Sequence, residues 1–411
     1  MNHKDREILR SLAARVREIA ELPEMETRKQ RWYRHNDLEP ERPLVLCFPE
    51  GAWEELLPRD DRSLKCSDPQ ARDWEYRLRK SIYWWELIRD DNVLEPYFDI
   101  PWRVDWGSYG VREVVTHGEN RGSYTWDPPI KNLDEDFAKL RFRKPKVDRQ
   151  TTLNELALAT EIFGDLLPPR IHGQLWWSMG LTWEAIRLIG LEEFMIVMYD
   201  NPSGLHRLMA WLRDDHMRVI QWAEDEGLLS LNNTNGYTGS GGVAYTRQLP
   251  QPDWQPGMPV RLKDLWGFAE SQETVGVSPE MFGEFILPYQ LPLLARFGLN
   301  CYGCCEPLHA RWDYVRTVPR LRRVSVSPWC DQRIMAEKMG RNYIFSRKPN
   351  PAMICVSFNE ETVRADIRNT LQIAGSCPLE IIMKDTHTVQ NDPTRITRWV
   401  QIALEEVHRF C

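Results

Sequence analysis

The second half of the chain alternates short apolar runs with longer stretches in which apolar residues recur every three or four positions. Short runs bounded by Gly, Pro or charged residues are typical of buried strands, and the longer periodic stretches are typical of helices. The pattern predicts strands at 170–176, 228–232, 262–268, 299–302, 322–327, 342–346 and 379–383. It predicts helices at 182–189, 192–197, 204–225, 279–297, 308–318, 332–340, 360–374 and 393–410.

This alternation is typical of βαβ units that build a parallel sheet. If residues 97–116 contribute one or two further strands, the total fits a TIM-type (β/α)8 barrel better than an open, doubly wound sheet. The chain also has no Gly-rich strand-to-helix turn of the dinucleotide-binding type, which argues against the open sheet. We therefore predict an α/β fold, a TIM-type (β/α)8 barrel preceded by an N-terminal extension of helical and mixed structure.

The region before residue 150 has a less regular pattern. We predict helices at 4–22 and 70–91, a short strand at 43–48 and a charged surface segment at 26–42. Residues 127–148 are rich in Asp, Pro and Lys and poor in apolar residues, and a strong helix begins soon afterwards. Such a change in composition is typical of a boundary between structural units. We therefore predict an N-terminal extension at 1–150 that caps a barrel domain at 151–411.

Composition and charge exclude several classes of function. The 411-residue chain is 42% hydrophobic and can bury one large core or two moderate ones. Its 53 Lys and Arg residues are scattered and are outnumbered by 60 Asp and Glu residues, which argues against a nucleic-acid-binding surface. The N-terminal residues do not resemble a signal peptide, and no apolar run approaches the roughly 18–20 residues that span a bilayer. We expect a cytoplasmic protein without membrane contact, in which the cysteines are reduced.

Polar clusters follow several predicted strands, and barrels and open sheets place their ligand sites at the carboxyl ends of parallel strands. His172 and Trp176 belong to the first cluster, and Tyr237 lies in a polar, Gly-rich loop at 232–242. We predict that these three residues bind substrate, although a lone His at a strand is more often a satisfied core or rim residue than a ligand. The loop can either cradle an anion with its amides or cover the barrel mouth. The eighteen Trp residues favour an aromatic-lined cavity or interface and a Trp-rich core about equally.

A cluster of carboxylates follows the strand predicted at 262–268. Glu270 and Glu273 are candidate general acids or bases, or metal ligands, and Gln272 between them is a candidate substrate-binding residue. Side chains alternate along a strand, so Glu270 and Gln272 would point to one side and Glu273 to the other, unless the strand ends first.

Cys304, Cys305 and Glu306 follow the strand predicted at 299–302, and Asp385 and His387 follow the last predicted strand. Thiolates, a carboxylate and an imidazole at neighbouring strand ends suit a transition metal, and a catalytic zinc typically has three protein ligands and one open position. We predict Cys304, Cys305, Glu306 and His387 as metal ligands and Asp385 as a catalytic residue. Adjacent cysteines on a strand face opposite sides, so both can bind one metal only if the strand ends at Gly303. The alternative is a pair of buried thiols beside a turn.

A series of motifs follows the predicted strands and helices of the second half. They are Ser278-Pro279-Glu280 and the residues that follow to Pro288, the Cys304 region, Ser325-Val-Ser-Pro-Trp, Asp331, Ala336-Glu337, Gly340 and Lys348-Pro-Asn-Pro351. Their order and spacing resemble the uroporphyrinogen decarboxylase superfamily, and most of all its branch of cobalamin-dependent methyltransferases acting on methanol, methylamines and methoxylated compounds. The resemblance covers roughly residues 160–411 and implies a TIM-type barrel.

In that branch a His-x-Cys pair at one strand end and a Cys near the last strand hold zinc. Here Tyr302 and Cys304 stand at the His-x-Cys positions, and His387 lies near the place of the late Cys. The resemblance therefore implies Cys304 as a zinc ligand and suggests Cys305, Glu306 and His387 as replacements for the missing ligands. It places Tyr302 at the site, and we assign Tyr302 to substrate binding. The Arg-rich N-terminal signature of the decarboxylase itself has no counterpart in residues 1–60.

These observations give a functional hypothesis with two alternatives. The hypothesis is a zinc-dependent methyltransferase that moves a methyl group between a small methylated substrate or a thiol and a corrinoid, as in a demethylation system. Asp385 and His387 resemble part of the corrinoid-binding signature, but Gln390 replaces its Gly and few residues follow, so we expect the corrinoid (cobalamin) on a separate protein. The resemblance also implies a possible homodimer. The alternatives are a metal-free decarboxylase or lyase that uses Glu270, Glu273 and Asp385, and a non-catalytic accessory protein that binds a small molecule.

Overall fold

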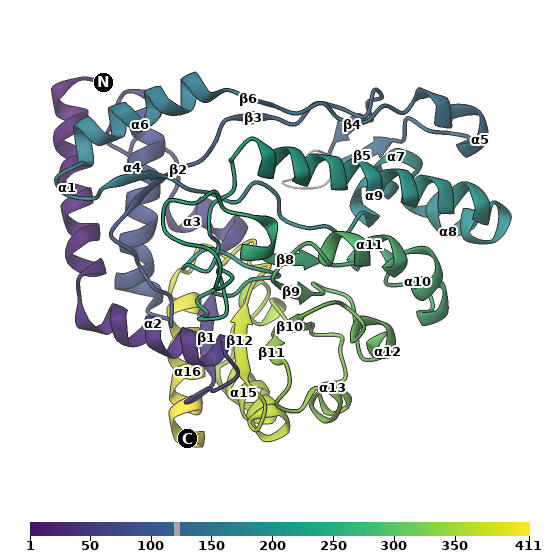
Figure 1. Cartoon of the computed structure of the whole chain (residues 1–411). Coiled ribbons are helices and arrows are strands. Elements are labelled where there is room, and N and C mark those ends of the chain that lie inside the picture. The colour runs from purple at the N-terminus through teal and green to yellow at the C-terminus, as the bar shows by residue number, and fades with distance from the viewer. Residues whose placement is uncertain (119–123) are drawn as a thin grey trace.

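The computed structural model describes residues 1–118 and 124–411 of the chain (Figure 1). Its centre is a six-stranded sheet in which every neighbouring pair of strands is parallel. The fold is therefore of the α/β class, as predicted. In spatial order the strands are β1 (Leu44–Cys47), β12 (Leu379–Met383), β11 (Ile344–Arg347), β10 (Leu321–Val326), β9 (Leu299–Tyr302) and β8 (Trp266–Ala269).

Helices connect these strands and cover the sheet (Figure 1). In the described part of the chain, none of them combines the length and the apolar character needed to cross a bilayer. The helices after the Asp- and Lys-rich segment are α6 (Arg149–Phe163), α7 (Thr182–Ile189), α8 (Leu191–Asp200), α9 (Pro202–Asp225), α10 (Pro279–Phe285), α11 (Leu287–Leu294), α12 (Trp312–Val315), α13 (Gln332–Met339), α14 (Ala352–Cys355), α15 (Glu360–Ala374) and α16 (Thr394–Phe410).

The N-terminal region contributes one strand to this sheet. Strand β1 pairs in parallel with β12, and Leu44 lies opposite Glu380 in the register. The other five strands of the sheet all lie in the predicted domain at 151–411. The predicted extension at 1–150 thus supplies one strand to the sheet of that domain. The α-helices and other strands of this region are α1 (His3–Ala20), α2 (Pro23–Asn36), α3 (Trp53–Leu56), α4 (Pro69–Tyr83), α5 (Leu133–Asp136) and the short strands β2 (Phe98–Ile100), β3 (Val104–Asp105), β4 (Val114–His117), β5 (Tyr124–Asp127) and β6 (Lys146–Val147).

The sheet does not close into an eight-stranded barrel within the described residues. Strand β7 (Pro169–Ile171) pairs with β2 in a separate two-stranded sheet, and the predicted strand at 228–232 is not a strand. At that position the side-chain amide of Asn232 takes the place of a neighbouring backbone. Its Nδ2 donates to the carbonyl of Trp266 at 2.9 Å, and its Oδ1 accepts from the N–H of Trp266 at 2.9 Å. Because this side chain occupies a pair of backbone groups that a further strand would use, β8 stays at the edge of the sheet.

Helix α2 corrects the prediction of a charged surface segment at 26–42. Three of its residues, Trp32, His35 and Asn36, are fully buried. The polar ones have partners inside the protein: His35 Nε2 lies 3.2 Å from Glu380 Oε2, and Asn36 Nδ2 donates to the carbonyl of Val243 at 2.9 Å. A helix that buries polar side chains in this way does not show the apolar periodicity by which buried helices are recognised.

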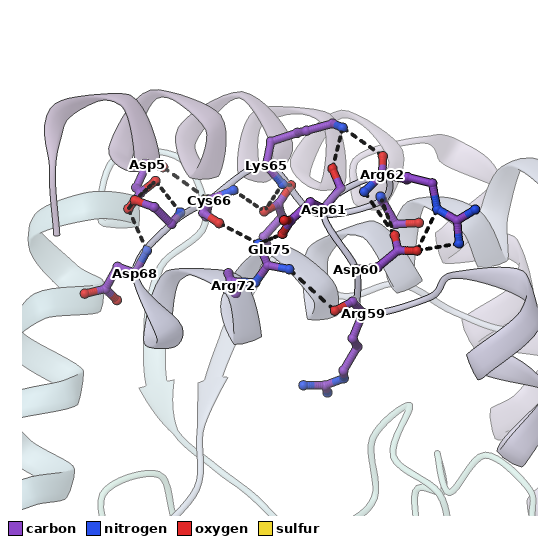
Figure 2. A network of polar contacts seen from close by, with 12 residues as sticks. Asp5, Arg59, Asp60, Asp61, Arg62, Lys65, Cys66, Asp68, Arg72 and Glu75 are labelled. Atoms are coloured by element: carbon purple, nitrogen blue, oxygen red, sulfur yellow. Dashed lines mark hydrogen bonds and ion pairs between the residues drawn. The ribbon is translucent and has the colours of Figure 1, made fainter.

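Two buried carboxylates, one on α1 and one on α4, bind the backbone of residues 65–68, the segment just before α4 (Figure 2). Glu75 on α4 accepts hydrogen bonds from the N–H groups of Lys65 at 2.9 Å and Cys66 at 2.8 Å. Asp5 on α1 accepts from the N–H groups of Ser67 at 2.9 Å and Asp68 at 3.1 Å. Burial raises the pKa of each carboxyl, but these backbone donors outweigh it, so both pKa values lie below the ordinary range. The contacts hold α1 and α4 together at one side of the sheet.

The Gly-rich loop at 232–242 continues into the interior of the protein and does not form a lid. Residues 238–246 are all buried. A Cβ atom on Gly239 would lie 2.9 Å from Cys301 Cβ, and one on Gly242 would lie 2.9 Å from Arg323 Cζ. The glycines are therefore required because the backbone passes directly over side chains of β9 and β10.

Replacing Gly242 with Ala is expected to lower the free energy of unfolding by about 2–3 kcal/mol. Its φ of +136° is a conformation that almost only glycine adopts, and the added methyl group would meet the Arg323 guanidinium. Urea denaturation measures the change. Gly227→Ala is the matched control, because Gly227 also has a positive φ, +67°, but has no atom within 4 Å of the added Cβ. Its expected cost is only about 1 kcal/mol, and equal losses in the two variants would contradict the close packing of the loop.

Candidate functional site

Two thiols lie side by side at the carboxyl end of β9. The strand ends at Tyr302, and Gly303, with a φ of +89°, turns the chain away from the sheet. Because the strand has ended, Cys304 and Cys305 are not forced to opposite faces, and their Sγ atoms are 3.7 Å apart. The turn at Gly303, the condition for both cysteines to reach one site, is confirmed.

Cys304 is the thiol that its surroundings favour as a thiolate. Its Sγ accepts hydrogen bonds from Ser240 Oγ at 3.2 Å and Lys384 Nζ at 3.5 Å. The hydrogen bond from the Cys305 thiol and the charge of the Lys384 ammonium lower the pKa of Cys304 below its ordinary value, although burial opposes them. The same hydrogen bond, together with burial, raises the pKa of Cys305. The surroundings therefore favour Cys304 as the thiolate of the pair and Cys305 as the thiol that donates to it.

Glu306 holds the backbone of this turn. One carboxylate oxygen accepts from the N–H of Ser271 at 2.9 Å, and the other accepts from the N–H of Cys304 at 2.9 Å. Arg311 Nη1 donates to Ser271 Oγ at 3.1 Å and so joins the same network. Both oxygens of the fully buried Glu306 are thus engaged with backbone. These contacts do not support Glu306 as a metal ligand, and they give it the role of fixing Cys304 against the end of β8.

A second group of donors lies at the carboxyl ends of β12 and β1. Glu50, Asp385 and His387 each offer a ligand atom, and these atoms all lie within 4.8 Å of one another. The N–H of Asp385 donates to Glu50 Oε2 at 3.1 Å, and Asp385 Oδ2 lies 3.8 Å from Cys305 Sγ. Asp385 therefore links the thiols to the carboxylate and imidazole. Within the described residues, the predicted set of Cys304, Cys305, Glu306 and His387 does not itself form such a group.

Two pair distances match those around a tetrahedral zinc ion, but within the described residues Cys304, Cys305 and Asp385 do not form a group of three ligand atoms that all lie within 4.8 Å of one another, as Glu50, Asp385 and His387 do. Two sulfurs bound at about 2.3 Å would be about 3.8 Å apart, and a bound sulfur and oxygen would be about 3.6 Å apart. The distances of 3.7 Å between the thiols of Cys304 and Cys305, and of 3.8 Å from Cys305 to Asp385, agree with these values. Thiolate, carboxylate and imidazole are also the donors that zinc prefers.

Sequence reasoning overlooked Glu50, Lys384 and Ser240. Glu50 lies in a 3-10 turn, Glu50–Ala52, shortly after β1, and so it reaches the site only because β1 pairs with β12. Lys384 directly follows β12, as the predicted residues Asp385 and His387 do, and this position is the signal that could have identified it. Ser240 belongs to the buried part of the Gly-rich loop.

Two cavities adjoin this group of residues. The first, which we call the loop cavity, has a volume of about 460 Å³, and its lining includes His172, Trp176 and Tyr237. Burial lowers the pKa of His172, which favours the neutral imidazole, and raises the pKa of Tyr237. The positive charge of Lys384 partly offsets this rise in the pKa of Tyr237, and the same ammonium contacts Cys304, so Lys384 connects the loop cavity to the thiols. Three of the five predicted substrate-binding residues, His172, Trp176 and Tyr237, thus line one cavity.

The second cavity, which we call the carboxylate cavity, has a volume of about 450 Å³. Glu184, Glu270, Gln272 and Glu273 line it together with Trp106, Trp176, Trp177 and Trp183. Strand β8 ends at Ala269, and a 3-10 turn, Gln272–Thr274, follows. Because the alternation of side chains stops there, Glu270 and Glu273 both reach this cavity.

Glu270 is the most perturbed acid at the site. Burial, followed by repulsion from Glu273 and Glu306, raises its pKa well above the ordinary value. Its Oε1 accepts from Ser178 Oγ at 3.1 Å, and its Oε2 accepts from the N–H of Gln272 at 3.0 Å. A carboxyl whose pKa is raised in this way favours its protonated form and is suited to act as a general acid.

Tyr302 does not line either cavity. Its side chain is fully buried, and its hydroxyl donates to Gln290 Oε1 at 2.7 Å. Gln290 Nε2 in turn donates to the carbonyl of Glu270 at 2.9 Å. The structure gives Tyr302 a supporting position behind Glu270 and does not support its prediction as a substrate-binding residue.

Comparison with known proteins finds a likeness among solved structures. No family model matches the chain, and no curated protein matches it. Among solved structures, the chain is similar to a methyltransferase from Methanosarcina mazei with a TM-score of 0.51 and 13% sequence identity. The match covers 93% of this chain and 98% of that chain. What the two proteins share is the fold.

Proposed function

We propose that this protein is a zinc-dependent methyltransferase related to the cobalamin-dependent branch of the uroporphyrinogen decarboxylase superfamily. It would move a methyl group between a small methylated substrate or a thiol and a corrinoid on a separate protein. The observation that carries the proposal is the position of the Cys304 and Cys305 thiols, 3.7 Å apart at the carboxyl end of β9 and 3.8 Å from Asp385 across to the end of β12. The fold shared over nearly the whole chain with a methyltransferase supports it.

Cys304 and Cys305 would hold the zinc ion together with a donor from the neighbouring group of Glu50, Asp385 and His387. When bound, zinc supplies Lewis acidity, which favours the thiolate form of a thiol or polarises a methyl donor. Lys384 and Ser240 hold the Cys304 sulfur by hydrogen bonds and favour its ionised form. The loop and carboxylate cavities, both lined by Trp176 and Trp177, would bind the small substrate and exclude water from it.

Elemental analysis of the purified protein tests the proposal. We expect about one zinc per chain in the wild type and loss of zinc in Cys304→Ser, because the hydroxyl of serine is a much poorer ligand than a thiolate. Cys377→Ser is the matched control, since Cys377 is also buried but contacts the carbonyl of Ala336, away from the site. Absence of zinc from the wild type after anaerobic reconstitution with zinc would overturn the proposal.

A metal-free lyase is the second candidate, and the buried, protonation-prone carboxyl of Glu270 favours it. In that case Glu270 would donate a proton to the substrate, with Glu273 as its neighbour in the same cavity. The two functions are separated by one comparison. A methyltransferase loses activity in Cys304→Ser, whereas a lyase loses activity in Glu270→Gln and keeps it in Cys304→Ser.

A further inference from the structure

Cys304 and Cys305 are the two cysteines whose sulfurs contact each other. All nine cysteines of the chain are free. Among the described residues, the hydrogen bond of 3.7 Å between Cys304 Sγ and Cys305 Sγ is the only one that joins two thiols. The side chain of Cys305 is only half-buried, whereas Cys304 is 3% exposed. A small molecule can therefore reach the pair beside Cys305.

The surroundings of the two sulfurs differ in charge. Lys384 Nζ lies 3.5 Å and Ser240 Oγ lies 3.2 Å from Cys304 Sγ, so an ammonium and a hydroxyl both donate to this sulfur. Cys305 Sγ instead lies 3.8 Å from the carboxylate oxygen Oδ2 of Asp385. A cation favours the thiolate, which is the nucleophilic form, and a carboxylate favours the neutral thiol. Cys304 is thus suited to attack an electrophile, and Cys305 lies within reach of the product.

The peptide group between the two cysteines is held by the protein. Ser325 Oγ donates to the carbonyl of Cys304 at 2.8 Å, and Glu306 accepts from the N–H of Cys304 at 2.9 Å. The Cα atoms of adjacent residues lie about 3.8 Å apart, closer than the roughly 4.4–6.8 Å that is usual in a disulfide. A disulfide between Cys304 and Cys305 would therefore twist this peptide group against the Ser325 contact. Such a bond is strained and is reduced more readily than an ordinary disulfide.

We propose that a hydroperoxide oxidises the metal-free form of the site to a reversible disulfide between Cys304 and Cys305, and that this modification switches the site off. Zinc binds thiolates, so the sulfurs of a disulfide no longer serve as its ligands. Bound zinc would in turn occupy both sulfurs and protect them. The effect on zinc rests on the proposed function, whereas the disulfide itself depends only on the position of the two thiols.

The oxidation is balanced without any further reactant. The Cys304 thiolate attacks one oxygen of the hydroperoxide, so a sulfur–oxygen bond forms, the oxygen–oxygen bond breaks, and the leaving alkoxide or hydroxide takes a proton from solvent. Cys304 is then a sulfenic acid. The Cys305 sulfur attacks the Cys304 sulfur, the sulfur–oxygen bond breaks, and the oxygen leaves as water with the thiol proton. The two sulfurs together lose two electrons, which reduce the hydroperoxide. Glutathione reverses the change by thiol–disulfide exchange.

Mass spectrometry of the full-length, metal-free protein after treatment with one equivalent of hydrogen peroxide tests the proposal. We expect the loss of two hydrogen atoms, located by digestion to Cys304 and Cys305, and complete reversal by glutathione. Cys301→Ser is the matched control, because Cys301 is also buried on β9 but its sulfur lies beside the Arg323 guanidinium, at 3.9 Å from Nη1. This variant should form the same disulfide as the wild type.

Two further variants separate the roles of the two sulfurs. Cys304→Ser should not change in mass, because it lacks the attacking thiolate. Cys305→Ser should stop at the sulfenic acid of Cys304, which adds one oxygen and is trapped by dimedone. Either variant tests the assignment if the other fails to fold.

Ser325→Ala tests the source of the strain. Without the hydroxyl that holds the carbonyl of Cys304, the peptide group can twist more easily, so the disulfide should require severalfold more glutathione for its reduction. A purely structural role of Ser325 would not change this requirement.

A disulfide to any other cysteine, or oxidation of Cys304 beyond the sulfenic acid without a disulfide, would overturn the inference. Zinc analysis of the same samples separates it from the proposed function. If the disulfide forms but the reduced protein holds no zinc and transfers no methyl group, the thiol modification stands and the proposed function fails. If the reduced protein holds zinc and transfers a methyl group but peroxide yields no disulfide in the metal-free protein, the proposed function stands and the modification fails.

Discussion

Replacing Glu380 with Ala is expected to lower the free energy of unfolding by about 3–5 kcal/mol. Glu380 on β12 is fully buried, and its carboxylate lies 3.0 Å from Arg323 Nε and 3.2 Å from His35 Nε2. Ser346 Oγ also donates to it. Removing the carboxylate would leave the Arg323 guanidinium buried without its counter-ion, and burying an unpaired charge is among the most costly changes that a core can undergo.

The pH dependence of stability provides a second measurement on the same group. Burial raises the pKa of Glu380, but Arg323 and His35 outweigh it and lower the pKa to about 2. Since the unfolded value is about 4.3, this carboxylate stabilises the folded state fully above about pH 5, and its contribution is lost as the pH falls toward 2. The shift corresponds to about 3 kcal/mol.

Urea denaturation between pH 3 and pH 7 checks both expectations. The wild type should lose stability toward low pH more steeply than Glu380→Ala, which lacks the titrating group. Glu361→Ala, at an exposed position on α15, is the control and should change stability by less than about 0.5 kcal/mol. A Glu380→Ala protein as stable as this control would show that the buried ion pair contributes nothing to folding.

Cys304→Ser is expected to lower the rate of methyl transfer by at least about 10³-fold. Zinc acting as a Lewis acid contributes several kcal/mol to lowering the barrier, and each 1.36 kcal/mol corresponds to about a factor of ten in rate. The Cys304 sulfur also accepts hydrogen bonds from Lys384 and Ser240, which favour its thiolate form. The assay follows transfer of the methyl group from methylcobalamin to a small thiol under anaerobic conditions.

Lys384→Met is expected to lower the rate of methyl transfer less than Cys304→Ser does. The ammonium of Lys384 lies 3.5 Å from Cys304 Sγ but is not one of the proposed ligands, so its loss should slow the reaction without removing zinc. Cys377→Ser should retain the wild-type rate. A Cys304→Ser protein with more than about a tenth of the wild-type rate would show that the thiolate is not required.

Local pattern was sufficient to predict many of the elements. The predicted bounds of β9, β12, α7 and α15 coincide with those of the structure. Each of these elements has an uninterrupted apolar run or an apolar stripe on one face, so its own sequence indicates which of its residues are buried. The predicted helix at 308–318 is reduced to α12, because the residues around Glu306 and Arg311 are used to fix the thiols instead.

Where polar side chains meet inside the protein, local pattern was misleading. The buried His35 and Asn36 made α2 look like a surface segment, because their partners, Glu380 and Val243, are hundreds of residues away. Similarly, the side chain of Asn232 replaces backbone at the edge of β8, and nothing in the sequence around it indicates that exchange.

The sequence by itself determined that polar donors follow strands, and that Gly303 lets Cys304 and Cys305 leave the strand together. Only the tertiary structure decided which donors meet. Glu50 lies beside Asp385, 335 positions away in the sequence, because β1 pairs with β12. Glu306, by contrast, accepts a hydrogen bond from the backbone of its own loop, at Cys304. The physical reason is that the order of strands in a parallel sheet depends on long-range pairing, whereas local pattern fixes only where each strand ends.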